Sequence, residues 1–327
     1  MKILAVGEVM MRLTPPNYKL IEQTDTLDLS FSGTGLNILS GLSRNGIQTS
    51  LLTNLPDNSV GKAAGAFIRK LGVKDDWLNY SGQHIGTYFL ELGFGNRPSN
   101  VTYLNRSTSS FCQNELPNKL VEEAVLAHDM IHICGIALST SKVSRKLILE
   151  VVETAHLNQK KIVFDFNFRP SLNEEIDYQQ LLEDYRFILS HAHFVFGNAR
   201  DLINLYPQEK LSEKELLQLF FNEFKQIEWL SGTSRKEDNL LSGFVYLPNE
   251  KIESDLKELA TYDRIGTGDA YAAGVLLGYM REWPLQETVN FAIAAAELAH
   301  TTFGDSPLLD EHFIRKYMSQ PKTSVFR

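Results

Sequence analysis

The stretch from 130 to 166 contains the pattern that decides the fold. It begins with Met130-Ile131-His132-Ile133-Cys134 and ends with Ile162-Val163-Phe164-Asp165-Phe166. Between them, Ser141–His156 repeats Leu, Val and Ile at helical spacing among Lys and Glu. A short, nearly continuous apolar run is typical of a strand buried on both faces. Two such runs joined by an amphipathic helix predict a β–α–β unit, and therefore a parallel sheet.

The same alternation extends over most of the chain. Three further apolar runs are predicted as strands: Ile3–Val6, Phe194–Phe196 and Glu228–Leu230. Three further segments have a helical period: Leu36–Arg44, Val60–Leu71 and Ser212–Phe224. The sequence thus predicts an α/β fold with a doubly wound, mostly parallel sheet that has helices on both faces.

Two segments, roughly 9–32 and 84–110, interrupt this alternation. The first includes the alternating run Leu27–Phe31, and the second pairs Thr87–Leu92 with Val101–Leu104 across a Gly- and Pro-containing turn, which is a hairpin pattern. No linker divides the chain, so we expect one domain over 1–327 that carries these strands as a small β-sheet. That sheet is either a lid over a site or a plain edge hairpin, and the pattern leaves both open.

Composition and charge exclude several classes of protein. The 327 residues include 32 Lys and Arg against 40 Asp and Glu, which gives a net charge of −8, and no basic cluster suits nucleic acid. The longest apolar runs fall well short of the roughly 20 residues of a membrane span. Cys112 and Cys134 form no disulfide framework, and no histidine spacing predicts a metal site. We expect a cytoplasmic protein that binds neither nucleic acid nor membrane.

A glycine-rich turn precedes the long apolar helical segment Ala270–Gly278. It reads Asp263-Arg264-Ile265-Gly266-Thr267-Gly268-Asp269. Glycines before a helix let successive N–H groups converge, and the helix N-terminus adds a positive dipole end, so the turn suits phosphate oxygens. Asp269 is either a structural cap or a base for an attacking hydroxyl. Tyr271 replaces the third glycine of GxGxxG, and no Walker A Lys follows, which excludes both of those nucleotide motifs.

Two further segments place polar residues where ligands of α/β proteins gather. Ser32-Gly33-Thr34-Gly35-Leu36-Asn37 is a second small-residue turn that opens a helix. Asp165, Asn167 and Arg169 follow a predicted strand at a spacing of two, which can direct all three side chains to one face at its carboxyl end. A solvated loop is the simpler interpretation of the three polar residues after the strand.

Taken together, these segments resemble the ribokinase/PfkB family of sugar kinases, in the same order and over nearly the whole chain. Gly7-Glu8, Arg12–Pro16 and His300–Asp305 resemble the branch that phosphorylates 2-keto-3-deoxygluconate. The resemblance implies a ribokinase-like fold with a β lid over the sugar. It also implies ATP and Mg²⁺ as cofactors and phosphoryl transfer to the terminal hydroxyl of a sugar acid.

The resemblance also implies catalytic and sugar-binding roles. Asp269 would be the general base, and the N–H groups of Gly266, Thr267 and Gly268 would form an anion hole for the transferred phosphoryl group. Arg169 would meet the carboxylate of the sugar acid. The full set expected around the sugar is Gly33, Gly35, Asn37, Tyr88, Tyr103, Arg106, Asp165, Asn167 and Arg169. In this branch the lid arginine usually follows the aromatic pair directly, where this chain has Asn105.

The expected nucleotide site is drawn from the C-terminal half. Its residues are Asn198, Asp201, Ser231, Gly232, Thr233, Arg235, Gly266, Gly268 and His300. Asn198-x-x-Asp201 stands where the family has Asn-x-x-Glu, and the shorter Asp favours magnesium contact through water; direct metal ligands are left unassigned. The Ser231–Arg235 segment is expected after the last central strand, and His300 and Asp305 near the adenine.

Several alternatives remain at this point. The chain can be a fructokinase, ribokinase or another relative that acts on a neutral sugar, although Arg169, Tyr88 and Tyr103 favour an acid. It can also be a binding or regulatory protein on the same fold, but the retained Asp269 argues against that. A dinucleotide-dependent oxidoreductase lacks its GxGxxG. Exposed strands in the lid predict a homodimer through the lids.

Overall fold

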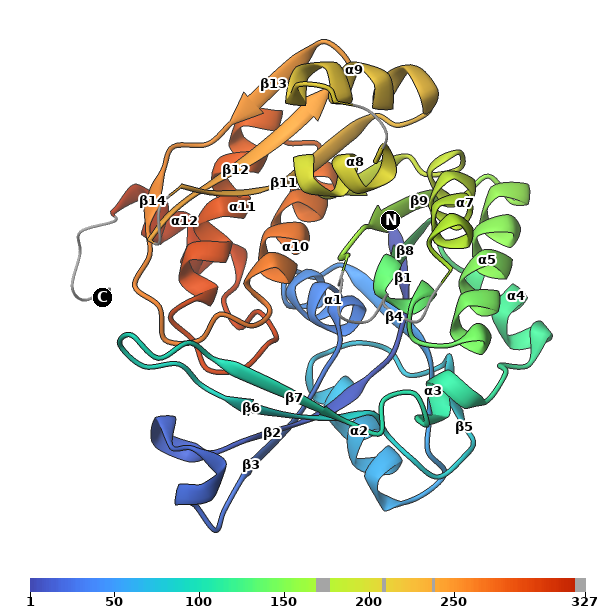
Figure 1. Ribbon diagram of the computed structural model, residues 1–327, viewed down its shortest axis with the longest axis vertical. Coiled ribbons are helices and arrows are strands. Elements are labelled where there is room, and N and C mark those ends of the chain that lie inside the picture. Colours follow the sequence, from blue (N-terminus) through green and yellow to red (C-terminus); the bar gives the residue numbers. More distant parts are fainter. Residues whose placement is uncertain (169–176, 208–209, 237–238, 321–327) are drawn as a thin grey trace.

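The computed structural model describes residues 1–168, 177–207, 210–236 and 239–320. Ten strands form its large sheet: β1 (Lys2–Val6), β4 (Gln48–Leu55), β5 (Leu78–Tyr80), β8 (Met130–Cys134), β9 (Lys161–Asp165), β10 (Phe194–Phe196), β11 (Trp229–Lys236), β12 (Leu240–Leu247), β13 (Glu250–Glu253) and β14 (Lys257–Glu258). Their order is β13-β12-β11-β10-β9-β8-β1-β4-β5, with β14 paired to β12 (Figure 1).

Parallel pairing runs from β5 through β11, and β12, β13 and β14 pair antiparallel. The helices are α1 (Thr34–Arg44), α2 (Ser59–Lys70), α3 (Ser110–Gln113), α4 (Asn118–Leu126), α5 (Lys142–Leu157), α7 (Tyr178–Leu189), α8 (Ala199–Leu205), α9 (Glu213–Glu223), α10 (Thr267–Met280), α11 (Leu285–Ala299) and α12 (Glu311–Ser319). Short 3₁₀ turns lie at Pro16–Tyr18, Ile21–Gln23 and Gly135–Leu138. The predicted mostly parallel, doubly wound α/β fold is confirmed.

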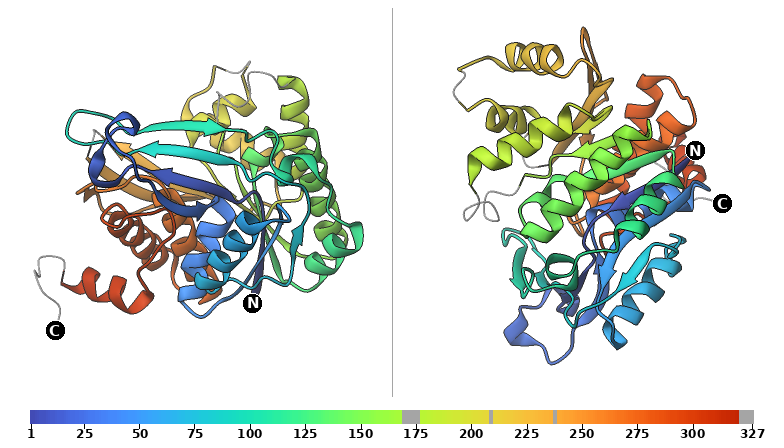
Figure 2. Two further views of the ribbon diagram at one scale, coloured as in Figure 1. Left: turned by 90° about the horizontal axis from the view of Figure 1, so that it is seen from below. Right: turned by 90° about the vertical axis from the view of Figure 1, so that its right-hand side faces the viewer.

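Two hydrophobic cores, one on each face of the large sheet, explain why β1 is apolar from Ile3 to Val6. Leu4 and Val6 pack with residues of α4, α5, α7 and α9. Ile3 and Ala5, which point the other way, pack with residues of α1, α2, α10 and α11. Helices therefore cover both faces (Figure 2), and a strand in this position has no polar face to present.

A separate four-stranded sheet is built from the two segments that interrupt the α/β pattern. Its strands are β2 (Met10–Thr14), β3 (Asp28–Ser32), β6 (Thr87–Glu91) and β7 (Asn100–Leu104), in the order β3-β2-β6-β7. The β2–β6 pair is parallel and the other two are antiparallel. This small sheet stands off one end of the larger body (Figure 1). All five residues of β7 are exposed.

The structure corrects the sequence prediction at one edge of the large sheet. The sequence predicts Glu228–Leu230 as the last central strand, with Ser231–Arg235 after its end. Instead β11 continues to Lys236, because Leu230–Lys236 pair antiparallel with β12. The β4 strand was not predicted. In the described residues, no helix combines the length and apolar character needed to cross a membrane.

Candidate active site

A cavity of about 590 Å³ lies between the small sheet and the carboxyl ends of the central strands. It gathers residues that are far apart in the sequence, including most of those predicted for the site. The predicted residues that line it are Gly33, Gly35, Asn37, Tyr88, Tyr103, Arg106, Asp165, Asn167, Asn198, Asp201, Ser231, Gly232, Thr233, Gly266, Gly268 and Asp269. Arg169 lies outside the described residues.

The glycine turn forms the start of α10 and borders this cavity. Gly266 is the N-cap residue and has a left-handed backbone with φ = 77°. A Cβ at this position would lie 1.9 Å from the carbonyl oxygen of Asp305, so only glycine fits. The N–H groups of Thr267, Gly268 and Asp269, in the first helical turn, have no acceptor within the helix. They and the helix dipole make this end of the cavity favourable for an anion.

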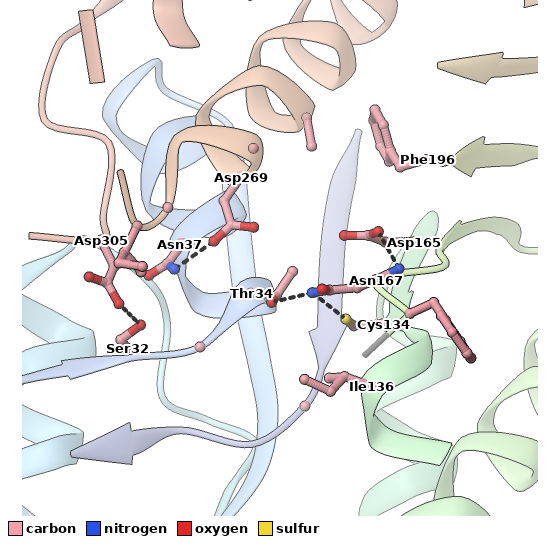
Figure 3. Close-up of a pocket in the computed structure, with 18 of the residues that line it drawn as sticks. Ser32, Thr34, Asn37, Cys134, Ile136, Asp165, Asn167, Phe196, Asp269 and Asp305 are labelled. Carbon is pink, nitrogen blue, oxygen red and sulfur yellow. Dashed lines mark hydrogen bonds between the residues drawn. The ribbon is translucent and has the colours of Figure 1, made fainter. Parts of the chain in front are cut away.

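Asp269 occupies the first turn of α10 and contributes its carboxylate to the cavity. The buried Asn37, on α1, donates a hydrogen bond from Nδ2 to Asp269 Oδ2 at 2.7 Å (Figure 3). Asn37 Oδ1 in turn accepts from Ser306 Oγ at 3.3 Å. The carboxylate is therefore held in a fixed orientation beside the N–H groups of the same helix end.

Asp165 and Asn167 reach the cavity by a route that the spacing of two did not predict. Asp165 ends β9, and Asn167 has a left-handed backbone with φ = 37°, so the extended geometry does not continue. The backbone N–H of Asn167 donates to Asp165 Oδ1 at 3.1 Å, and its Nδ2 donates to Thr34 Oγ1 at 3.1 Å (Figure 3). An Asx turn thus brings the two side chains together.

Cys134 lines the cavity next to these residues. Asn167 Nδ2 donates to its Sγ at 3.3 Å. Burial, assisted by the charge of Asp165, raises the pKa of Cys134 to about 12. The side chain is therefore a neutral thiol at physiological pH and an inert part of the wall rather than a nucleophile.

The small sheet contributes Tyr88 and Tyr103 to the cavity, from opposite positions on β6 and β7. The Tyr88 hydroxyl donates to Asp305 Oδ2 at 2.5 Å, and its ring is nearly buried. The Tyr103 ring lies 6.2 Å from it and is 44% exposed. One aromatic ring is thus fixed in the wall and the other remains accessible to a ligand.

Arg106 lines the cavity although it is one residue later than the resemblance led us to expect. Asn105 has φ = 51°, and this left-handed turn directs the chain back toward β1. Arg106 Nε donates to Glu8 Oε2 at 2.9 Å, and the guanidinium lies 5.3 Å from the centre of the Tyr103 ring. Burial opposes the charge, but the Glu8 carboxylate outweighs it and raises the pKa of Arg106. Glu8, for which the sequence suggested no role, also lines the cavity.

Asn198 and Asp201 form the N-terminus of α8 at the other end of the cavity. They make a capping box, in which Asn198 Oδ1 accepts from the N–H of Arg200 at 2.8 Å and Asp201 Oδ2 accepts from the N–H of Asn198 at 2.8 Å. One carboxylate oxygen is thus engaged in the cap. Across the described residues, no group of three or more His, Cys, Asp or Glu side chains is arranged to hold a metal ion.

Ser231, Gly232 and Thr233 line the cavity from within β11. Ser231 Oγ donates to the carbonyl of Phe244 at 2.8 Å, so its hydroxyl already has a structural partner. A Cβ on Gly232 would lie 2.3 Å from the carbonyl oxygen of Gly197, which requires glycine at this close approach of β10 and β11.

Three predicted residues are not among those that line the cavity: Thr267, Arg235 and His300. Thr267 Oγ1 donates to the carbonyl of Arg264 at 3.1 Å. His300 is fully buried at the end of α11, with Nδ1 2.7 Å from the carbonyl of Ala296 and Nε2 3.3 Å from a terminal nitrogen of Arg235. Burial lowers the pKa of His300, so its ring is neutral.

Asp305 lies elsewhere than expected, since the sequence predicts it near the adenine. It lies under the small sheet, where its carboxylate accepts from Ser32 and Tyr88, and it lines the cavity (Figure 3). Arg264 also lines the cavity, although its place inside the glycine turn was the only sequence signal for it.

Comparison with known proteins agrees with this geometry. Residues 1–311 match the pfkB family of carbohydrate kinases. The chain is 27% identical over 314 residues to a 2-dehydro-3-deoxygalactonokinase from Haloferax volcanii, covering 93% of this chain and 92% of that protein.

Two crystal structures have the same fold. A protein from Enterococcus faecalis, provisionally named 2-keto-3-deoxygluconate kinase, superposes with a TM-score of 0.94 at 43% identity and covers 100% of this chain and 99% of that one. A 2-dehydro-3-deoxygluconokinase from Thermotoga maritima superposes with a TM-score of 0.88 at 26% identity, covering 98% and 99% of the two chains. The chain belongs to the pfkB family of carbohydrate kinases.

Proposed function

We propose that this sugar kinase transfers the γ-phosphoryl group of ATP to the terminal hydroxyl of a sugar acid, with 2-keto-3-deoxygluconate as its substrate. One observation carries the proposal: the Asp269 carboxylate lies beside the N–H groups that open α10, in a cavity that Arg106, Tyr88 and Tyr103 also line. The substrate class is further supported by the names of the sugar-acid kinases to which the chain is similar.

In this mechanism Asp269 accepts the proton of the attacking hydroxyl. Asn37 fixes the orientation of this carboxylate through its hydrogen bond to Oδ2, on the wall of the cavity where the hydroxyl would lie. The N–H groups of Gly266, Thr267 and Gly268 stabilise the charge on the transferred phosphoryl group, because they are preorganised by the helix end. Proton acceptance and charge stabilisation thus come from one rigid element.

The sugar is proposed to lie between the small sheet and α1. Asp165, Asn167, Gly33 and Gly35 form the wall there, and amide and carboxylate side chains suit sugar hydroxyls. The guanidinium of Arg106 is oriented by Glu8 through Nε, so its terminal nitrogens are available for the carboxylate of the sugar acid. Arg169 is predicted to assist.

The nucleotide is proposed to extend toward β11 and α8. Thr233, Gly232, Ser231, Asn198 and Asp201 line that end of the cavity, and Arg235 and His300 are predicted to lie behind it. Asp201 would hold Mg²⁺, which would offset the charge of the ATP phosphates, because magnesium often binds proteins through one carboxylate and water. The capping bond of Asp201 Oδ2 favours contact through water.

A coupled assay of ADP release against a panel of sugars tests the substrate. The panel contains 2-keto-3-deoxygluconate, 2-keto-3-deoxygalactonate, 5-keto-2-deoxygluconate, fructose and ribose. We expect the highest kcat/KM with 2-keto-3-deoxygluconate. A higher kcat/KM with fructose or ribose would replace the sugar acid by a neutral sugar.

We also propose that the chain is a single cytoplasmic domain in which the small sheet acts as a lid and forms a homodimer interface. The small sheet has exposed apolar side chains at Leu29 (57%), Val101 (37%) and Leu104 (43%), and such patches mark contact surfaces. Size-exclusion chromatography with light scattering should give a dimer mass, and Leu104→Glu should give a monomer. A monomer mass for the unaltered protein would contradict the interface.

A further inference from the structure

Arg12 is a fully buried guanidinium on β2 of the small sheet, and the proposed function does not use it. Its three nitrogens have three different partners. Nε donates to Thr14 Oγ1 at 2.9 Å, Nη2 donates to Asp263 Oδ2 at 2.7 Å, and Nη1 donates to Asp305 Oδ1. Its Cζ atom lies 5.1 Å from the centre of the Phe303 ring. The side chain therefore connects the small sheet to two loops of the α/β body.

Asp263, the first of the two carboxylates that Arg12 binds, holds the backbone that leads into the glycine turn. Asp263 Oδ1 accepts from the N–H of Ile265 at 3.0 Å, one residue before Gly266. Asp263 Oδ2 accepts from Arg12 and from the N–H of Gly304 at 3.3 Å. Its side chain has no exposed surface. Because each oxygen has a partner, the start of the turn is fixed relative to Arg12.

Asp305, the second of these carboxylates, contacts both the small sheet and Gly266, the N-cap residue of α10. Asp305 Oδ2 accepts from Ser32 on β3 and from Tyr88 on β6. The Asp305 carbonyl oxygen lies 1.9 Å from the point that a Cβ on Gly266 would occupy, so its backbone rests directly on that residue. The same aspartate thus touches a predicted sugar-binding tyrosine and the N-cap of α10.

The charge of this cluster requires a cation at its centre, and the directions of its three hydrogen bonds require an arginine. Two buried carboxylates face one cation, and burial opposes the charge of Arg12, but Asp305 and Asp263 outweigh it and raise the pKa of the guanidinium. A planar guanidinium can donate to two carboxylates and to Thr14 at once. A lysine ammonium keeps the charge, but its donors lie on one compact group. It therefore cannot bind the carboxylates of Asp263 and Asp305 at the same time.

We propose that Arg12 is a positioning residue that couples the small sheet to the anion-hole turn through Asp263 and Asp305. The inference rests on the proposed role of the Gly266–Asp269 turn and not on the identity of the sugar. A displacement of β2 is transmitted through the guanidinium to the backbone that precedes Gly266 and to the carboxylate that binds Tyr88. The donor groups for the phosphoryl oxygens and the wall of the sugar site are therefore set together.

This coupling predicts a distinct kinetic signature for Arg12→Lys. Misplaced N–H donors weaken only the transition state, so kcat at saturating ATP and sugar should fall about tenfold or more. The KM for the sugar should rise, because Asp305 and Tyr88 lose their common anchor. The KM for ATP should change less than threefold, because the cluster contacts the predicted nucleotide residue His300 through a backbone hydrogen bond, from the N–H of Asp263 at 3.2 Å, that the substitution leaves in place.

Arg145→Lys is the matched control. Arg145 also pairs through two nitrogens with one buried aspartate, Asp184, at 2.5 Å and 3.0 Å, but it lies between α5 and α7 and does not line the cavity. Both variants should lower the midpoint of thermal unfolding, whereas only Arg12→Lys should change kcat and the sugar KM. A folded Arg12→Lys enzyme with kcat and sugar KM within twofold of the unaltered protein would overturn the inference.

Two additional variants keep the test decisive. Should Arg12→Lys fail to fold by circular dichroism, Asp263→Asn replaces it, because that change breaks the ion pair of Arg12 with Asp263 and leaves Arg12 and Asp305 as a neutral pair. The same fall in kcat is expected, and unchanged kinetics reject the coupling. Asp269→Asn is measured in the same assay: full activity there would refute the proposed site, whereas an inactive Asp269→Asn beside an unaffected Arg12→Lys would refute only the coupling.

Discussion

At the residue scale, Glu8 determines how Arg106 is presented to the cavity. Its Oε2 accepts from Arg106 Nε at 2.9 Å and its Oε1 accepts from Ser109 Oγ at 2.7 Å, and both members of the ion pair are largely buried. The carboxylate thus links the end of β1 to the chain that leaves β7. Through this contact one acidic residue can control recognition of an acidic substrate.

We predict that Glu8→Ala raises the KM for the sugar acid about tenfold, because a hydrogen bond to a charged group is worth about 1.5–3 kcal/mol. Glu8→Gln keeps an acceptor for Arg106 and should have a smaller effect. Steady-state kinetics with both variants test this, with Glu115→Ala as the control for an exposed ion pair. An unchanged KM in Glu8→Ala would show that Arg106 needs no such support.

At this scale the sequence identifies candidate site residues only where they lie close together along the chain. Asp269, Gly266 and Gly268 are recognisable because they are consecutive or nearly so, and Asn37 follows its own turn closely. The Arg12–Asp305 contact joins residues 293 positions apart. Only the pairing of β2 inside the small sheet brings them together, so the sequence could not predict the cluster or the position of Asp305.

At the scale of the element, the fold at the start of α10 requires glycine at position 266 but not at position 268. Gly266 has a positive φ and no room for a Cβ, whereas a Cβ on Gly268 would meet nothing within 4 Å. Gly266→Ala should therefore lower the free energy of unfolding by about 2 kcal/mol or more, and Gly268→Ala should leave it unchanged or slightly higher. Urea denaturation of both variants measures this, and equal effects would contradict the difference.

The elements were predicted best where one strong pattern decides them. The central parallel strands β1, β8, β9 and β10 are covered on both faces, so their apolar runs predict them. The predicted strand Glu228–Leu230 ends earlier than β11 does, because Ser231, Gly232 and Thr233 add no apolar residues to the pattern. Their strand geometry comes from pairing with β12. Gln48–Leu55 mixes Thr, Ser and Asn into a buried strand, where pairing with β1 again outweighs local preference.

At the scale of the whole molecule, buried histidines link stability to pH. His132, on β8, has no exposed surface, and neither ring nitrogen has a hydrogen-bond partner. Burial lowers its pKa to about 4. The unfolded chain has an ordinary histidine pKa of about 6.5, so it binds the proton more readily than the folded protein between these two values. The contribution of neutral His132 to the free energy of unfolding is therefore fully present above about pH 6.5, and it is lost as the pH falls toward 4.

His132→Leu should reduce this acid sensitivity. The free energy of unfolding of the unaltered protein should decline with falling pH by up to about 1.4 kcal/mol per unit for each such proton. In the variant the decline between pH 6.5 and 4 should be shallower by up to that amount. Urea titrations at several pH values provide the test, and parallel curves for the two proteins would mean that His132 does not contribute.

The central claim for the whole protein is that the cavity between the small sheet and α10 transfers a phosphoryl group with Asp269 as the base. The most direct test is the kcat of Asp269→Asn with saturating ATP and sugar, because Asn keeps the size and a bond to Asn37 but cannot take a proton. We predict a kcat lower by about 10² or more, with unchanged ATP affinity by calorimetry. A kcat close to that of the unaltered enzyme would contradict the account.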